Sequence, residues 1–447
     1  MDSKWVRFFP YFIRQHLEGR SYLQNVLNNI GWLFSERILQ MGVGLFVGVW
    51  MARYLRPGPY GVLNYAMAFA ALFSPIATLG MDGIVVRNLV RDPSKSDTML
   101  GTAFILRFGG GIAGFLIIIA AVILVRPGDH LVHWLAGIIG AGLAFQAFDV
   151  IRFWYESQVR SRNIVFARNA AFCAMALVKV VLILFHAPLI AFAWALLAEI
   201  ALTAFGFSVV YHANGRRMKQ WQWNTAEAKT LVRESWPLFL SSMAFIVYMK
   251  IDQVMLGNMA GDKEVGIYSA AVRLSEIWYF IPVAIVSSVS PSIVEAKRTS
   301  EDLYYQRLGK LFRLMTGISY GIASIMTFFS NVLVLSLFGS AYGEAGLVLS
   351  IHIWSSLFFF LAAARSPWIL NEGLMKISLY SAILGALSNV MLNLLLIPRF
   401  GPTGAALATL VSYAFSAFLF NAFLRPTRII FFMQLRALFF VPMRKPE

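Results

Sequence analysis

Long apolar segments alternate with short polar ones along most of the chain. In the first half, apolar runs of membrane-crossing length fall near 31–52, 61–86, 101–125, 131–155, 164–185 and 188–211. In the second half they fall near 235–258, 265–290, 311–338, 345–370, 376–397 and 402–424. About 20 apolar residues suffice to cross a bilayer as a helix. The pattern therefore predicts an all-α integral membrane protein with twelve transmembrane helices.

The polar stretches divide the chain into five parts. Residues 1–30 mix aromatic and basic side chains, which predicts an interfacial segment. We expect an N-lobe of six helices over 31–211, a cytoplasmic linker over 212–234 and a C-lobe of six helices over 235–424. A basic amphipathic tail is expected over 425–447. No small-residue cleavage pattern precedes the first apolar run, so no cleavable signal is expected.

Two short matches indicate that the halves are related. The sequence YGVLNYA at 60–66 matches VGIYSAA at 265–271, and Ala187-Pro188 precedes the sixth run as Gly401-Pro402 precedes the twelfth. An even number of spans gives both halves the same orientation in the membrane. We therefore predict a parallel repeat of two six-helix lobes, related by a pseudo-two-fold axis along the membrane normal.

Composition and charge agree with this class. The chain is 59% hydrophobic and only 13% charged, and its single cysteine allows no internal disulfide. The formal charge of +16 suggests no nucleic-acid partner, because the basic residues gather at alternate helix ends. The side opposite the N-terminus carries only Arg53, Arg56, Arg126, Lys263 and Arg399. This bias predicts that both termini are cytoplasmic and that membrane lipids are the partners of the basic ends.

Charged residues inside the predicted spans are the candidate functional groups, because charge in hydrocarbon is costly and usually marks a wet pathway. Arg273 and Glu276 are three residues apart and share a helix face. Lys250 and Asp252 are two apart, so we expect them to have separate partners. An arginine near the bilayer midplane can hold a phosphate through two parallel hydrogen bonds. The alternative for Arg273 is an ion pair with Glu276 that only fixes helix packing.

Further charges lie in the first half. Gln146, Asp149, Arg152 and Glu156 form one polar stripe along the fourth predicted helix, where they are expected to line a cavity with Asp252 and Glu276. Glu199 stands alone in its span and is a candidate for ion coupling, as is Asp82. A hydrogen bond to a neighbouring helix is the alternative for Glu199. Near the inner ends, Asp82, Arg107 and Arg365 are expected to reach water by snorkelling. Of the adjacent Glu36 and Arg37, only one can face a cavity directly, and we favour Arg37.

Motifs of soluble enzymes are not found. The chain has no Gly-Lys-Ser/Thr phosphate loop, no His-Glu-x-x-His and no cysteine cluster, so no cofactor or metal site is expected. The run at 109–114 formally fits G-x-G-x-x-G, but it lies within a span and predicts close helix packing instead. The predicted outer connections are all too short for a catalytic domain. We therefore expect a protein that is not an enzyme, which argues against a membrane-embedded polymerase or ligase.

The segment KIDQVMLGNMAGDKEVGIYSAAVRLSEIWYFIP at 250–282 resembles the polysaccharide repeat-unit (O-antigen, Wzx-type) flippases of the multidrug, oligosaccharidyl-lipid and polysaccharide exporter superfamily. Similar stretches are NNIGWLFSERILQMGVGLFVGVWMARYLRPGPYGVLNYA, FQAFDVIRFWYESQVRSR and IPRFGPTGAALATLVSYAF. The resemblance extends from about Asn28 to Leu424. It implies a two-lobed transporter of the cell inner membrane that moves undecaprenyl-pyrophosphate-linked oligosaccharides outward.

The resemblance also implies roles for residues and partners. Arginines in the first and eighth helices hold pyrophosphate in lipid-linked peptidoglycan precursor flippases of the same superfamily, and Arg37 and Arg273 lie where those would fall. With Lys250 they form the predicted pyrophosphate site. In lipopolysaccharide or O-antigen biosynthesis, a polymerase and a chain-length regulator are candidate partners. The alternative within the superfamily is a cation-coupled multidrug exporter, against which three deep cations argue.

Overall fold

The computed structural model describes residues 21–441, so most of the predicted interfacial segment and the end of the predicted tail lie outside the described part. All regular elements between these limits are helices. Within this described part, ten helices are long and apolar enough to cross a membrane, or eleven if the bent pair Pro57–Leu72 and Ser74–Arg91 is one span. The predicted all-α membrane fold class is confirmed. The exact number of twelve spans stays a prediction.

The chain forms two compact units that do not follow its two halves. Within the described residues, unit 1 runs up to Gly48 and adds Phe73–Ala121 and Gly137–Phe239. Unit 2 contains Val49–Leu72, Val122–Ala136 and the chain from Leu240 onward. Some helices pass from one unit into the other without interruption. The lobe boundaries expected from the sequence stay a prediction.

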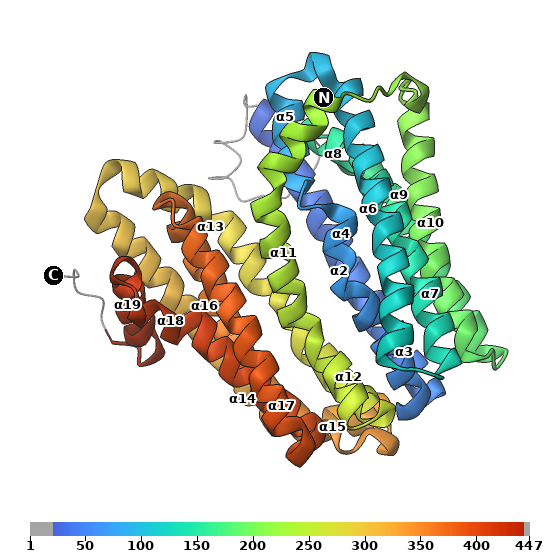
Figure 1. The fold of residues 1–447 in the computed structure, drawn as a ribbon. Helices are drawn as coiled ribbons and strands as arrows, with labels where there is room; N and C mark the ends of the chain where they lie inside the picture. Colours follow the sequence, from blue (N-terminus) through green and yellow to red (C-terminus); the bar gives the residue numbers. More distant parts are fainter. Residues whose placement is uncertain (1–20, 442–447) are drawn as a thin grey trace. The chain divides into compact units, whose positions relative to one another are not determined.

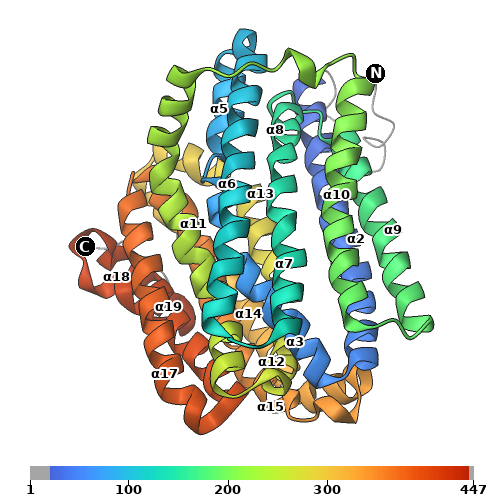
Figure 2. The same ribbon diagram turned by 45° about the vertical axis from the view of Figure 1, so that its right-hand side comes forward.

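Unit 1 is a bundle in which α9 and α10 pack side by side along their lengths (Figures 1 and 2). Its helices, whole or in part, are α2 (Ser21–Leu55), α4 (Ser74–Thr78), α5 (Asp82–Arg91), α6 (Ser96–Val125), α7 (His130–Phe145), α8 (Asp149–Ser157), α9 (Arg162–Leu184), α10 (Leu189–Ala213) and the start of α11 (Thr225–Met259). The short 3-10 turn Gln146–Phe148 joins α7 to α8.

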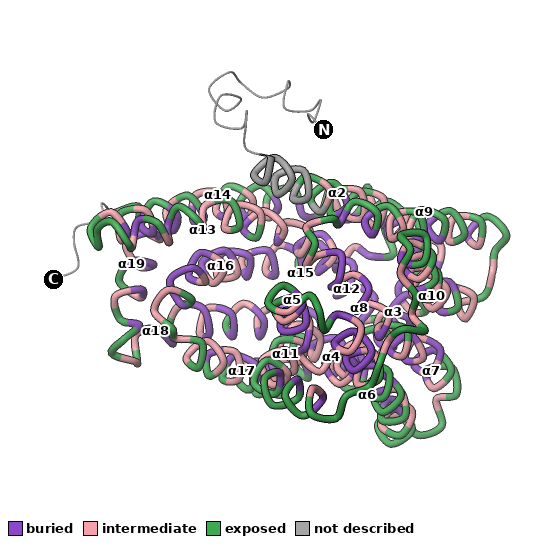
Figure 3. The backbone as a smooth tube through the Cα atoms, turned by 90° about the horizontal axis from the view of Figure 1, so that it is seen from above, coloured by how far each residue is buried: buried purple, intermediate pink, exposed green. Residues whose placement is uncertain are grey.

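Unit 2 is built around α16, which Figure 3 shows as largely buried. Its core brings together side chains of α13, α14, α16 and α19, among them Phe312, Phe360, Trp368 and Ile430. The complete helices of this unit are α3 (Pro57–Leu72), α12 (Asp262–Glu276), α13 (Phe280–Thr299), α14 (Glu301–Phe338), α15 (Ala345–His352), α16 (Ser355–Asn371), α17 (Met375–Ala414), α18 (Phe420–Phe423) and α19 (Arg428–Leu438).

The internal repeat appears in the contact between α3 and α12. The sequence match aligns Pro57 with Asp262, and these residues begin the two helices. A Cβ at Gly61 would overlap the carbonyl oxygen of Asp262, and one at the equivalent Gly266 would overlap that of Pro57. Both helices also break at matching places, after Leu72 and after Glu276. Two contacts that exchange under the repeat are what a local two-fold axis produces.

The long helix α17 contains a reversal of the chain. Its backbone at Gly401 has φ 52° and ψ −130°, outside the helical region. A Cβ at Gly404 would overlap the carbonyl oxygen of Leu396, although eight residues of straight helix would separate the two by about 12 Å. The two arms of α17 therefore fold back on each other. The sequence match of Gly401-Pro402 with Ala187-Pro188 falls at this turn and at the start of α10.

The outer surfaces of the helices are apolar. Large side chains such as Phe46, Leu124, Phe185 and Phe328 are 73–81% exposed. Soluble proteins rarely leave so much contiguous apolar surface in water, whereas lipid chains cover it in a membrane. These side chains agree with the membrane class.

Glycines let α6 approach its neighbours in unit 1. A Cβ at Gly111 would lie 2.7 Å from the carbonyl oxygen of Leu143 on α7, and a Cβ at Gly110 would lie 2.4 Å from the carbonyl oxygen of Ile76. Gly109 has nothing within 4 Å of its Cβ position. The prediction that the glycine run serves helix packing is confirmed.

Replacing Gly111 with leucine is expected to force α6 from α7 and to destabilise the protein by about 1–3 kcal/mol, the usual cost of overpacking. The matched control is Gly109→Leu on the same helix, which meets open space. The melting temperature in detergent measures both variants. Equal melting temperatures for the two would contradict the packing role of Gly111.

Candidate functional site

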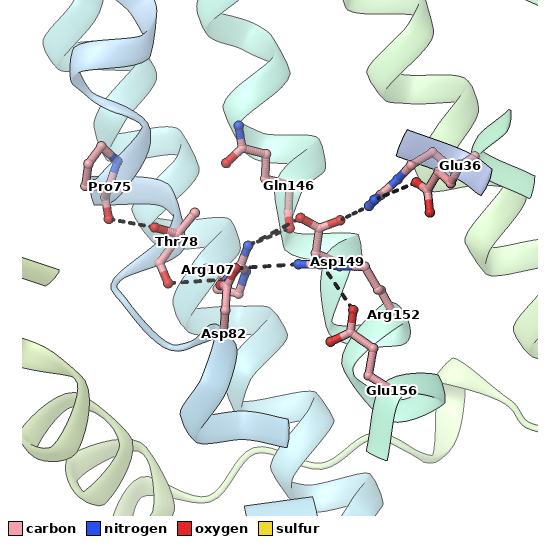
Figure 4. Close-up of polar contacts among 10 residues, drawn as sticks. Glu36, Pro75, Thr78, Asp82, Arg107, Gln146, Asp149, Arg152 and Glu156 are labelled. Atoms are coloured by element: carbon pink, nitrogen blue, oxygen red, sulfur yellow. Dashed lines mark hydrogen bonds and ion pairs between the residues drawn. The ribbon is translucent and has the colours of Figure 1, made fainter. Parts of the chain in front are cut away.

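In unit 1, seven charged side chains from five helices form one connected network (Figure 4). Its members, from α2, α5, α6, α8 and α9, are Glu36, Asp82, Arg107, Asp149, Arg152, Glu156 and Arg168. Four are acids and three are arginines. We call this set the N-network. Its acids and bases neutralise each other almost completely, with one carboxylate in excess.

Arg107 is the centre of the N-network. Its side chain is 0% exposed, and its Nη1 lies 2.5 Å from Asp82 Oδ1. Its Nη2 lies 3.7 Å from Asp149 Oδ2 and donates to the Gln146 carbonyl at 3.2 Å. The expectation that Arg107 snorkels to water is wrong, because these acceptors bind the guanidinium in place of water. Composition along α6 could not reveal this, since the acceptors come from other helices.

The predicted polar stripe on the fourth span takes part in the same network. Asp149 Oδ1 lies 3.8 Å from Arg168, which in turn lies 3.2 Å from Glu36. Arg152 bridges Asp82 at 3.5 Å and Glu156 at 3.4 Å. These carboxylates and guanidiniums are partly exposed apart from the buried Glu36. The stripe is thus a wall of paired charges, while its role in lining a transport cavity stays a prediction.

Glu199 is bonded to a neighbouring helix. Lys179 on α9 lies 2.6 Å from Glu199 Oε2 on α10. The alternative expected for Glu199, a hydrogen bond to a neighbouring helix, is confirmed, and the description of Glu199 as standing alone is wrong. Asp82 is likewise paired, with Arg107 and Arg152. Ion coupling through either acid stays a prediction and would have to break an existing ion pair.

Unit 2 holds the charges of the segment at 250–282. Lys250 Nζ lies 3.9 Å from Glu276 Oε2, and both side chains are about a quarter exposed, at 29% and 27%. Arg273 Nη1 lies 3.4 Å from the hydroxyl of Tyr60, a residue of α3. Arg273 stands eleven residues into α12, roughly 16 Å along the helix axis from Asp262. Its guanidinium is partly exposed, and a guanidinium can bind an anionic ligand through parallel hydrogen bonds.

Asp252 is enclosed in the same unit, with a side chain only 3% exposed. It accepts hydrogen bonds from Tyr268 at 2.8 Å and from Thr409 and Asn393 at 2.5 Å each. The expectation of separate partners for Lys250 and Asp252 is confirmed. Side chains of α12 and of both arms of α17 surround Asp252 on α11, and its role in lining a transport cavity stays a prediction.

The polar atoms around Asp252 are mostly oxygens. Besides the carboxylate they include Thr409 Oγ1 and the Tyr268 hydroxyl, together with the amide nitrogen of Asn393. Oxygen sets with one carboxylate could hold a hard cation. Nothing in the sequence pointed to this cluster, since Asn393 and Thr409 are separated from Asp252 by about 150 residues and are polar but uncharged.

The remaining predicted residue, Arg37, is exposed on α2 next to the buried Glu36. Glu36, and not Arg37, is the member of this pair that faces the N-network. Arg37 belongs to unit 1, whereas Lys250 and Arg273 belong to unit 2. The predicted three-cation pyrophosphate site therefore stays a prediction. Arg365 is buried, with its guanidinium bound to Asn421 and Ser381, so the expectation that it snorkels is wrong.

Comparison with known proteins identifies the family. The sequence profile described as "Polysaccharide biosynthesis protein" matches residues 26–297, more than half of the chain. This protein belongs to that family. A second profile, MatE, matches residues 237–395. Together with the apolar helices, the match identifies a multi-pass membrane protein.

Named relatives share a quarter of their residues over part of the chain. A "Probable flippase AglR" of Haloferax volcanii is 28% identical over 198 residues, which cover 41% of this chain and 40% of that protein. A "Capsular polysaccharide biosynthesis protein CapF" of Staphylococcus aureus is 24% identical over 191 residues, covering 42% and 48%. The matched chain thus spans less than half the length of these relatives.

Solved structures establish the fold over nearly the whole chain. An inward-facing multidrug resistance MATE family transporter of the MOP superfamily has a TM-score of 0.69 at 14% identity, covering 89% of this chain and 94% of that one. The lipid II flippase MurJ, in an inward closed conformation, has a TM-score of 0.63 at 15% identity, covering 93% and 91%. The family member described here therefore has the MOP-superfamily fold.

Arg107→Ala is expected to destabilise the protein by about 3–5 kcal/mol, because it leaves the carboxylates of Asp82 and Asp149 without their buried partner. Arg87→Ala serves as the control in the same unit. Arg87 pairs with Glu234 at the surface, where an ion pair contributes about 0–1 kcal/mol. Thermal unfolding in detergent distinguishes the two, and an equally small effect for both would contradict the central place of Arg107.

Proposed function

We propose that this chain is a flippase that translocates undecaprenyl-pyrophosphate-linked oligosaccharide repeat units, such as those of O-antigen, from the cytoplasmic to the periplasmic leaflet by alternating access. The observation that carries the proposal is Arg273, a partly exposed guanidinium on a broken helix. Membership of the polysaccharide biosynthesis family and the relative named a flippase support the same substrate class.

The chemistry of such a substrate explains the division of charged groups. A pyrophosphate needs fixed cations, and Arg273 offers a planar fork of hydrogen-bond donors that matches phosphate oxygens. Lys250 Nζ lies 3.9 Å from Glu276 Oε2, a separation that leaves the ammonium group free to turn toward an anion. Sugar hydroxyls need paired donors and acceptors, which the N-network supplies from its partly exposed members. Arg37 is the third cation assigned to the pyrophosphate.

A cation-coupled multidrug exporter is the second candidate, favoured by the MatE match at 237–395 and by the oxygen cluster at Asp252. Deletion of the gene distinguishes the two candidate functions. A flippase predicts accumulation of the lipid-linked oligosaccharide and loss of surface polysaccharide, whereas an exporter predicts sensitivity to cationic drugs with normal polysaccharide.

Arg273→Ala is expected to abolish export of repeat units at an unchanged protein level, because the pyrophosphate loses its bidentate partner. Arg273→Lys should recover only part of the activity, since an ammonium lacks the planar fork. Arg399→Ala, at an exposed arginine of the same unit, is the matched control and should export normally. Surface polysaccharide and the lipid-linked intermediate are the readouts, and normal export by Arg273→Ala would refute the assignment.

We further propose that the protein lies in the inner membrane with both termini in the cytoplasm. A cysteine at Lys263, in the turn that begins α12, should react with an impermeant maleimide added to intact cells. A cysteine at Lys219, between α10 and α11, should react only after the membrane is opened. Both cysteine variants are made in a protein whose single native cysteine, Cys173, is replaced. The reverse labelling pattern would overturn this orientation.

A further inference from the structure

The loop between α6 and α7 is fastened to α11 and α12 by one arginine. Arg126 Nη1 lies 2.8 Å from Asp262 Oδ1 and 3.4 Å from Asp129 Oδ2. Its Nε donates to Asn258 Oδ1 at 3.1 Å, and its guanidinium lies 3.8 Å from the ring centre of Tyr65 on α3. Tyr65 also donates to Asn258, at 3.0 Å. With a side chain only 11% exposed, Arg126 joins three segments of unit 2 at one point.

The same end of unit 2 is closed by the glycine contact between α3 and α12. Gly61 and Gly266 bring each helix against the first turn of the other, with no room for a methyl group. Nearby, the hydroxyl of Tyr342 donates to the carbonyl oxygen of Ala52 at 2.8 Å, and the rings of Tyr60 and Tyr342 meet edge to face. Residues 49–72 and 122–136 of the first half are thereby packed with the second half.

These segments are continuous with helices of unit 1. Helix α2 passes from unit 1 to unit 2 after Gly48, and α6 does so after Ala121. A transporter that opens its binding site to alternate sides must separate its two halves at each end in turn. At the end where α3 and α12 begin, separation breaks the contacts of Arg126 with Asp262 and Asn258.

We propose that Arg126, Asp262, Asn258 and the α3–α12 glycine contact form a latch that holds this end of the transporter closed and releases it in each cycle. Asp129 lowers the free-energy cost of separating Arg126 from Asp262. It lies in the same loop as Arg126 and keeps its ion pair when Asp262 leaves, so the guanidinium never becomes an uncompensated charge. The close glycine packing contributes van der Waals attraction between α3 and α12 only while the two helices touch. Because this attraction is lost as soon as they separate, the latch is either closed or open.

The latch rests on the alternating access of the proposed function, but it does not depend on which cargo is carried. Its test needs a reporter on the face of α12 that meets α3. Gly266 and Arg273 both contact α3, and Ser269 lies between them with a side chain only 4% exposed. A cysteine at Ser269, with Cys173 replaced, should react slowly with an impermeant maleimide while the latch is closed.

Arg126→Gln should raise the labelling rate of the Ser269→Cys reporter about fivefold or more, the range of a typical coupling energy. Asp262→Asn should act in the same direction while leaving the Arg126–Asp129 pair intact. This variant carries the test if Arg126→Gln does not accumulate. Lys263→Gln is the matched control, because Lys263 is the next residue and lies at the surface, 3.7 Å from the exposed Glu344. It should label as the unmodified reporter does.

The rates are measured in intact cells and in inside-out vesicles, so that the result does not depend on the orientation of the protein. Gly61→Ala and Gly266→Ala should both raise labelling, to similar degrees, because the repeat makes the two positions equivalent. Labelling at the unmodified rate in Arg126→Gln, or in Asp262→Asn where only that variant accumulates, would overturn the latch. Loss of polysaccharide export without faster labelling would also count against it.

Discussion

The cost of charge in hydrocarbon is the constraint on which this structure depends. The deep charges described above are bound by groups on other helices, by opposite charges at Arg107 and Glu199 and by neutral side chains at Asp252 and Arg365, and these contacts hold particular helices together. In unit 1, Arg107 gathers the acids of α5 and α8, and Arg168 adds those of α2 and α8. A bundle surrounded by lipid gains little from the hydrophobic effect between its helices. Ion pairs and close glycine packing therefore provide much of its specificity.

The two units use charge differently. The N-network is self-neutralising, and its groups gain nothing from an added anion unless existing pairs break. In unit 2 the pairing of Lys250 with Glu276 is looser, with 3.9 Å between the two charged groups and about a quarter of each side chain exposed. Loose pairing costs some stability but leaves cations able to bind a passing ligand. The proposed passage of a pyrophosphate headgroup rests on this contrast.

Sequence patterns predicted the helical membrane fold, the internal repeat and the glycine packing of α6. Such features depend on local hydrophobicity, spacing and small residues, which are written along the chain. The sequence also predicted that Lys250 and Asp252 have different partners, because two residues on a helix point apart. It failed where the answer depends on a distant helix. Arg107 and Glu199 each have an ion-pair partner on another helix, and the neutral Asn393 and Thr409 enclose Asp252 without any charge to reveal them.

Transfer of the lipid-linked oligosaccharide between the leaflets of proteoliposomes measures the central claim most directly. Purified protein is reconstituted with the intermediate that accumulates in the deletion strain, and the fraction accessible to a glycan-cleaving enzyme outside is followed over time. With wild-type protein, the fraction of lipid-linked oligosaccharide that the external enzyme can cleave should change steadily over time. With folded Arg273→Ala protein, that fraction should stay unchanged. Equal transfer by both proteins, or transfer of ordinary phospholipid at the same rate, would contradict an arginine that recognises a pyrophosphate headgroup.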